Sequence, residues 1–165
     1  MGDPVAWEEF GRALASADLD VDGFADLVVL TTRRIVVLFG SPWGLRGRSE
    51  LVAPPLRGSQ NMYLNAVVVG DFDGDRIEDV AVSTDGPLVD DHGLTGHHRV
   101  LVFRGSTAGF DSAPSLEFSK EPPGFADSEH SVGRGLAAGD VTGMDSTICW
   151  WATSLGPLSR WLGQS

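Results

Sequence analysis

Two short segments of the chain carry aspartates at a spacing that suits the binding of a divalent cation. They read Asp18-x-Asp20-x-Asp22-Gly-x-x-Asp26 and Asp71-x-Asp73-x-Asp75-Arg-x-x-Asp79. Calcium takes about six to eight oxygen ligands, which alternate carboxylates, a mid-loop carbonyl and a later aspartate can supply. The spacing predicts one calcium ion in each loop. The predicted ligands are Asp18, Asp20, Asp22, Asp26 and the carbonyl of Phe24 in the first loop, and Asp71, Asp73, Asp75, Asp79 and the carbonyl of Ile77 in the second.

The two loops differ at their sixth position. Gly23 stands there in the first loop and supplies the sharp turn, because glycine adopts a positive φ without the steric penalty of a Cβ. Arg76 stands at the equivalent place in the second loop. A non-glycine residue in the left-handed region costs roughly 1–2 kcal/mol, and this arginine also brings a positive charge. We therefore predict that the second loop binds calcium more weakly than the first.

The acidic loops have two other interpretations. An EF-hand loop begins in a similar way, but it requires a glutamate at about the twelfth position and flanking helices. Counting from the leading aspartates gives Val29 and Val82, and both flanks resemble strands, so the EF-hand interpretation fails. A solvated acidic turn without a metal is simpler, but clustered carboxylates repel one another without a cation, and the pattern occurs twice.

The acidic loops belong to an internal repeat, whose leading aspartates Asp18, Asp71 and Asp140 are 53 and 69 residues apart. In each complete copy, the loop is followed by two β-rich runs, at 27–30 and 34–39 in the first and at 80–83 and 99–103 in the second. Runs of Val, Ile, Leu and Phe bounded by turn residues indicate short strands. No stretch shows a helical period. The chain is predicted to be all-β.

Repeats of this length, each with a few antiparallel strands, are typical of the blades of a β-propeller. We predict a partial propeller of about two and a half blades over residues 1–143, with units at about 8–60, 61–130 and an incomplete 131–143. The polar segment 88–98 is expected to be an exposed loop, and 114–130 is expected to cross between blades. So few blades cannot close a ring, which leaves strand edges unpaired.

The third copy breaks off after Gly143, and residues 144–165 form an atypical tail that holds three of the five tryptophans. Only Asp140 and Thr142 remain of a third acidic loop. We hypothesise a reading-frame change at Gly143, because a shifted frame that begins there can rebuild the aspartate pattern. The nucleotide sequence of the gene tests this hypothesis.

The composition argues against several classes of partner. The 165 residues carry a formal net charge of −11, and such a chain repels phosphate backbones, so nucleic acid is not expected as a partner. No apolar run approaches the roughly 18 residues that a membrane span needs. The N-terminal segment has neither a basic start nor an apolar stretch, so this chain is expected to carry no signal peptide. Its single cysteine, Cys149, allows no disulfide framework.

No catalytic arrangement is recognisable in the sequence. The pair His97 and His98 lies near Asp90 and Asp91, but the spacing matches no metal motif, and a polar exposed loop is the better interpretation. A G-x-S-x-G elbow and a phosphate-binding loop are both missing from the sequence. The tryptophans Trp7 and Trp43 are predicted to pack rather than to stack on a ligand.

Taken together, the repeats resemble FG-GAP repeats, the units of the integrin α-subunit N-terminal propeller and of many bacterial secreted repeat proteins. The likeness rests on the two acidic loops, on the segment Phe10-Gly-Arg-Ala-Leu-Ala and on the hairpin end at 38–45, and it covers roughly residues 8–143. The resemblance implies a seven-bladed propeller, calcium in the loops of several blades, and an extracellular or cell-surface location.

We therefore expect a non-catalytic calcium-binding module for adhesion or for recognition of an unknown protein or glycan. Two alternatives stay open. In the first alternative, the chain is an accessory repeat segment of a secreted hydrolase. In the second, it is a truncated gene product without function.

Overall fold

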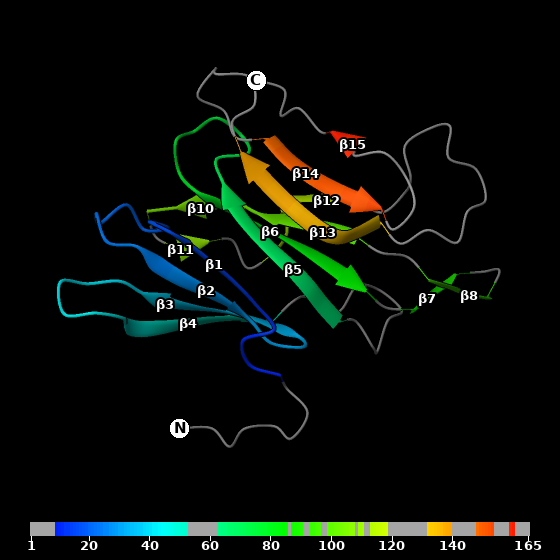
Figure 1. Cartoon of the computed structure of the whole chain (residues 1–165), viewed down its shortest axis with the longest axis horizontal. Coiled ribbons are helices and arrows are strands. Elements are labelled where there is room, and N and C mark those ends of the chain that lie inside the picture. The colour runs from blue at the N-terminus through cyan, green and yellow to red at the C-terminus, as the bar shows by residue number, and fades with distance from the viewer. Residues whose placement is uncertain are drawn as a thin grey trace.

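The computed structural model describes residues 9–52, 63–85, 87–90, 93–96, 99–107, 109–110, 113–118, 132–139, 148–153 and 159–160. All secondary-structure elements among these residues are β-strands, which confirms the all-β prediction (Figure 1). None of the described residues belongs to a helix long and apolar enough to cross a membrane.

The first repeat folds into a four-stranded antiparallel sheet in which the strands follow one another in chain order. Its second and third strands coincide with the β-rich runs predicted at 27–30 and 34–39. The fourth strand was not predicted, because its charged sequence lacks the apolar pattern of the others. The strands are β1 (Ala13–Ala17), β2 (Asp26–Leu30), β3 (Arg34–Phe39) and β4 (Arg46–Val52).

The second repeat builds an equivalent four-stranded antiparallel sheet, again in chain order. Its strands are β5 (Tyr63–Gly70), β6 (Asp79–Asp85), β9 (Arg99–Phe103) and β12 (Leu116–Phe118). The last of these strands lies in the segment 114–130 that was expected only to cross between blades, and residues 119–130 lie outside the described part of the chain.

Two small hairpins are inserted in the second repeat. One pairs β7 (Pro87–Asp90) with β8 (Gly93–Gly96), so these residues form strands rather than the loop predicted at 88–98. The other pairs β10 (Gly105–Ser106) with β11 (Gly109–Phe110) directly after β9.

A third antiparallel sheet contains β13 (Val132–Gly139), β14 (Ile148–Thr153) and β15 (Ser159–Arg160). The strand β14 lies in the tail that was predicted to be atypical, yet it pairs with β13 in the way that β2 pairs with β1. The reading-frame hypothesis concerns the gene and stays a prediction. The predicted unit boundaries also stay predictions, since several of them fall outside the described residues.

The three sheets stack through two apolar cores. The larger core joins the facing sides of the first two sheets through Val28, Leu30, Ile35, Val37, Leu64, Val67, Val80, Val82, Leu101 and Phe103. The smaller core joins the far side of the second sheet to β13 through Phe72, Ala81, Val100, Val102, Leu136 and Ala138. Successive residues of β6 therefore point into different cores, as the period of two of a strand requires.

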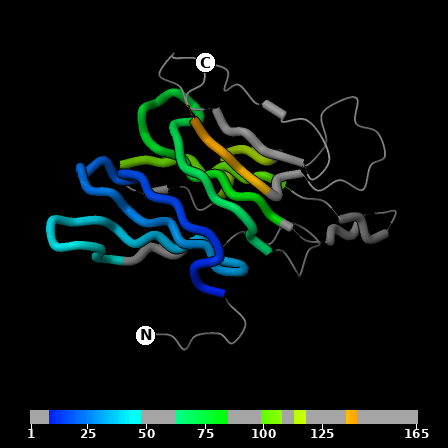
Figure 2. The backbone as a smooth tube through the Cα atoms, in the orientation of Figure 1, coloured from blue at the N-terminus to red at the C-terminus, as the bar shows by residue number. Residues whose placement is uncertain are grey.

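The first strands of the three sheets lie side by side, with β5 between β1 and β13 (Figures 1 and 2). This is how the inner strands of neighbouring propeller blades are arranged when blades radiate from a common axis. The described strands do not close into a barrel. The fold is therefore a partial β-propeller, as predicted.

The cores predict a contrast between two leucines of the first sheet. Replacement of Leu30, which is fully buried, by alanine should lower the free energy of unfolding by about 2–5 kcal/mol. The matched control is Leu14→Ala, because Leu14 is 58% exposed and its loss should change that free energy by about 0.5 kcal/mol or less. Urea denaturation measures both variants. Equal losses would contradict the stacking of the two sheets.

Candidate metal centres

Each acidic loop is the turn of the first hairpin of its sheet. Residues 18–25 connect β1 to β2, and residues 71–78 connect β5 to β6. In both hairpins the last ladder pair includes the final aspartate of the pattern, with Ala17 opposite Asp26 and Gly70 opposite Asp79. The repeated sequence pattern thus corresponds to the same place in two successive sheets.

The final aspartate closes each loop with two hydrogen bonds. Asp26 accepts the Leu19 N–H at Oδ2 (2.9 Å) and the Gly40 N–H at Oδ1 (2.7 Å). It is only 1% exposed. The carboxylate therefore ties the beginning of its loop to the residue that follows the third strand.

The second loop is closed in the same way. Asp79 accepts the Phe72 N–H at Oδ2 (3.0 Å) and the Gly105 N–H at Oδ1 (2.8 Å), and it is also 1% exposed. The burial of Asp79 raises its pKa to about 6; the charges of Asp73 and Asp75 add to this, whereas the two amide hydrogen bonds lower it.

The glycine that meets the final aspartate cannot carry a side chain. A Cβ at Gly40 would overlap the carbonyl oxygen of Ala25, and a Cβ at Gly105 would overlap that of Glu78. In the sequence, these glycines are recognisable only as the first residues of a turn that occurs in both repeats. Their link to the acidic loops was missed, although their matching positions in both repeats were a usable signal.

The leading aspartate of each loop organises the turn around itself. Asp18 accepts the N–H groups of Asp22 (3.0 Å) and Gly23 (2.9 Å). The second loop repeats this with Asp71, which accepts the N–H groups of Gly74 (2.7 Å) and Arg76 (2.9 Å). Such side-chain hydrogen bonds replace the backbone partners that a tight loop lacks.

The fifth position of each loop also fixes the backbone. Asp22 accepts the Phe24 N–H and Asp75 accepts the Ile77 N–H, both at 2.8 Å. Coordination of a cation by the carbonyls of Phe24 and Ile77 stays a prediction.

The structure brings three carboxylates together in each loop. One oxygen from each of Asp18, Asp20 and Asp22 lies within 4.8 Å of the others, and the same holds for Asp71, Asp73 and Asp79. Among the described residues, the predicted carboxylate ligands outside these two groups are Asp26, which closes the first loop, and Asp75. Oxygen-only groups of this kind suit calcium or another hard cation.

The third position supplies an oxygen without a hydrogen-bond donor in both loops. The atoms are Asp20 Oδ1 and Asp73 Oδ2, and both are buried. Burial raises the pKa of Asp20, and the charges of Asp22, Asp26 and Asp18 raise it further. Burial and the charge of Asp71 likewise raise the pKa of Glu78. Both loops thus bury carboxylate oxygens that accept no hydrogen bond, and the residues present fit a bound cation.

Each loop has two residues in the left-handed region, and only one of the two is a glycine. The first loop has Val21 (φ 59°) and Gly23 (φ 90°), and the second has Gly74 (φ 84°) and Arg76 (φ 70°). The predicted conformations of Gly23 and Arg76 are confirmed. The fourth position was missed, and with Val21 there the strain argument no longer distinguishes the two loops. The relative affinity of the loops stays a prediction.

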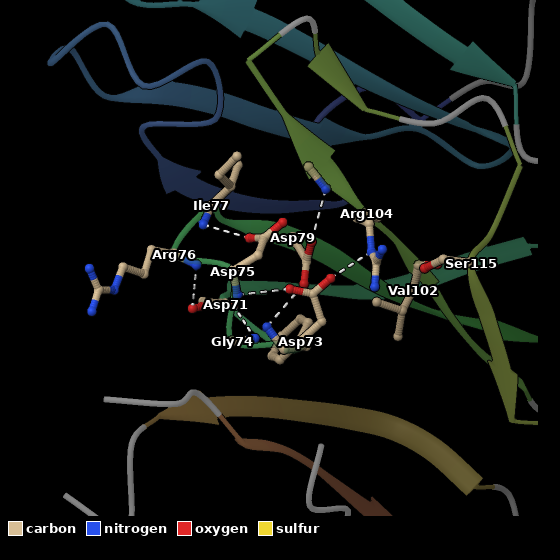
Figure 3. A network of polar contacts seen from close by, with 12 residues as sticks. Asp71, Asp73, Gly74, Asp75, Arg76, Ile77, Asp79, Val102, Arg104 and Ser115 are labelled. Carbon is tan, nitrogen blue, oxygen red and sulfur yellow. Dashed lines mark hydrogen bonds and ion pairs between the residues drawn. The ribbon is translucent and has the colours of Figure 1, made fainter. Parts of the chain in front are cut away.

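The positive charge that meets the second cluster comes from Arg104 rather than from Arg76. The Arg76 side chain extends away from the carboxylates, whereas Arg104 points toward them (Figure 3). Arg104 Nε lies 2.5 Å from Asp73 Oδ2. This contact is an ion pair, and Asp73 Oδ2 accepts no hydrogen bond. The one sign of this ion pair in the sequence was that Arg104 directly precedes Gly105.

Of the other residues considered from sequence, Trp43 differs from its prediction. It is 79% exposed, so the prediction that it packs was wrong. Its turn is held by the Ser41 hydroxyl, which donates to the Gly44 carbonyl (2.6 Å) and accepts the Trp43 N–H (3.2 Å). Positions discussed from sequence that lie outside the described residues include Trp7, Asp91, His97, His98, Asp140 and Thr142.

The stacked antiparallel sheets and their acidic hairpin loops define a partial β-propeller with candidate cation sites. No protein-family model matches the chain. The chain is similar to phosphatidylinositol-glycan-specific phospholipase D of Bos taurus, with 32% identity over 155 residues, 83% of this chain. It is also similar to the protein of the same name from Rattus norvegicus, with 30% identity over 156 residues, 84% of this chain. The chain spans 18% of the length of each of these relatives.

The backbone of the first loop predicts a stabilising substitution. Val21 is 54% exposed and has a positive φ, so Val21→Gly should raise the free energy of unfolding by about 1 kcal/mol through relief of strain. The matched control Val21→Ala removes the branched side chain but keeps the Cβ, and it should give much less. Thermal unfolding in excess EDTA compares the three chains without the effect of a cation. A loss of stability in Val21→Gly would contradict the strain at this position.

Proposed function

We propose that this chain is a non-catalytic, calcium-stabilised propeller segment that takes part in recognising a protein or glycan outside the cell. The observation that carries the proposal is the pair of equivalent loops in which a buried aspartate oxygen, Asp20 Oδ1 or Asp73 Oδ2, has no hydrogen-bond donor. An unsatisfied buried oxygen is costly. A bound cation would remove that cost at Asp20, and at Asp73 it would replace the exposed Arg104 as the charged partner of Oδ2.

The chemistry of the side chains favours calcium over other metals. Both clusters consist of carboxylates alone among the described residues, whereas zinc prefers nitrogen and sulfur ligands. Magnesium demands near-ideal octahedral geometry and keeps several waters, so it is rarely held by an all-protein loop. Calcium tolerates irregular shells and is the cation that the resemblance to FG-GAP repeats implies.

Calcium would add to the closure that Asp26 and Asp79 already provide. These aspartates connect each loop to the residue after the third strand, so a cation held by the neighbouring carboxylates would stabilise the turn end of the whole sheet. Extracellular calcium modules bind with dissociation constants of about 10⁻⁴–10⁻³ M. Sites of that affinity would be filled outside the cell, where the resemblance to FG-GAP repeats implies that the chain works.

The exposed turn at Trp43 is the surface that we assign to recognition. A tryptophan that presents its ring to solvent on a turn held by hydrogen bonds is preorganised for contact with a sugar face or an apolar side chain.

The similarity to two phospholipases supports a second candidate, in which the chain is an accessory repeat segment of a larger hydrolase. In that case the segment keeps the same calcium-dependent structural role, and catalysis belongs to sequence beyond the 18% that is matched. Hydrolysis of a phosphatidylinositol-glycan by this chain alone would contradict both candidates. A truncated product without function would instead be digested rapidly by protease in the presence of calcium.

Calcium should raise the melting temperature of the chain and EDTA should reverse the effect. A ligand that binds only the folded state at about 100 times its dissociation constant stabilises by about 2.7 kcal/mol, which corresponds to a shift of roughly 5–10 °C. Differential scanning fluorimetry in 10–100 mM calcium, which is about 100 times the expected constants, measures the shift.

Variants of the two loops locate the effect. Asp20→Asn and Asp73→Asn should each reduce the calcium-dependent shift, and the double variant should abolish it. The matched control is Glu9→Gln, because Glu9 is an exposed acid whose partner, Arg12, lies outside both loops. The same melting temperature with calcium and with EDTA in the unaltered chain would overturn the proposed function.

A further inference from the structure

The two acidic loops have different neighbours at one equivalent position. Phe39 precedes Gly40, whose N–H binds Asp26, and Arg104 precedes Gly105, whose N–H binds Asp79. The same place in the fold therefore carries a phenyl ring in the first sheet, where it packs against the larger core, and a guanidinium beside the second loop. Among the described residues, the chain thus contains its own comparison between a loop with an ion-paired cation and a loop without one.

The guanidinium lies against the oxygen that would otherwise be free for a metal. Arg104 Nε is 2.5 Å from Asp73 Oδ2, and the side chains of the pair are 55% and 19% exposed (Figure 3). In the first loop, Asp20 stands at the position of Asp73, and its buried Oδ1 has no hydrogen-bond donor.

We propose that Arg104 is a built-in counter-ion of the second loop that competes with calcium for Asp73, so that the two loops fill at different calcium concentrations. This inference rests on the proposed function, because it requires that the loops bind calcium. In calcium-poor solution Arg104 partly neutralises the second cluster, whereas no described cation neutralises the first.

The exposure of Arg104 makes it a displaceable partner. A side chain that is 55% exposed can move into water when calcium arrives, and exposed ion pairs of this kind are weak. Calcium must nevertheless break the pair or bind beside a like charge. For charges a few ångströms apart in a partly solvated site, this weakens calcium binding on the order of tenfold. Arg76 does not compete in this way, because its side chain points out of the loop (Figure 3).

The test is isothermal titration calorimetry with calcium chloride on the full chain. The Asp20→Asn background reports the second loop, and the Asp73→Asn background reports the first. In the Asp20→Asn background, Arg104→Gln should tighten calcium binding on the order of tenfold. The matched control Arg76→Gln removes a charge from the same loop and keeps a non-glycine residue at a positive φ, so it should change the affinity by a factor of about two or less.

The outcomes separate this inference from the function on which it rests. Calcium binding in the Asp73→Asn background, with unchanged or weaker binding after Arg104→Gln in the other background, would overturn the counter-ion role alone. Absence of calcium binding in every variant would overturn the proposed function and this inference together. Tighter binding after Arg104→Gln and after Arg76→Gln by the same factor would also overturn it, because the effect would then be one of net charge. Circular dichroism confirms that each variant is folded.

Discussion

The local structure of both candidate sites depends on one interaction, the acceptance of two backbone N–H groups by a buried aspartate. Asp26 and Asp79 each occupy both carboxylate oxygens in this way. Loss of either carboxylate would leave two amides without an acceptor in a buried place, which is costly. The same interaction explains why Gly40 and Gly105 cannot carry a Cβ. To donate its N–H to the aspartate, each glycine must lie so close to the loop backbone that a Cβ would overlap it.

The same hydrogen bonds connect the acidic loops to the stacking of the sheets. Asp26 binds the N–H of Leu19, which is fully buried in the core between the first two sheets. Asp79 binds the N–H of Phe72, which is 2% exposed in the core between the second sheet and β13. Each loop therefore anchors into a different interface between sheets. A cation that rigidifies a loop would accordingly strengthen the packing of that sheet against its neighbour.

Much of this architecture could be predicted because it is local in sequence. The apolar composition of residues 34–39 was enough to predict the strand β3 (Arg34–Phe39). The hairpin of β7 and β8 could not be found, because its Gly- and Asp-containing sequence has the composition of a loop. Arg104 and Gly105 act on aspartates 31 and 26 residues away in sequence, and such contacts are invisible to a pattern of spacings. Trp43 was misjudged because an apolar side chain gives no sign by itself that its turn faces solvent.

The two loops adopt the same backbone conformation although their glycines stand at different positions. The positions that both loops share therefore show what this conformation requires. Both need a left-handed residue at the fourth and at the sixth position, yet each uses glycine at only one of them. Val21 and Arg76 hold a positive φ at an energetic cost. The hydrogen bonds that the loop N–H groups donate to the leading aspartate therefore outweigh this strain. Burial, and to a lesser extent the charges of Asp73 and Asp75, raises the pKa of Asp79 to about 6. A doubly charged ion can offset the clustered carboxylates more fully than one guanidinium does, because it can meet several of them at once.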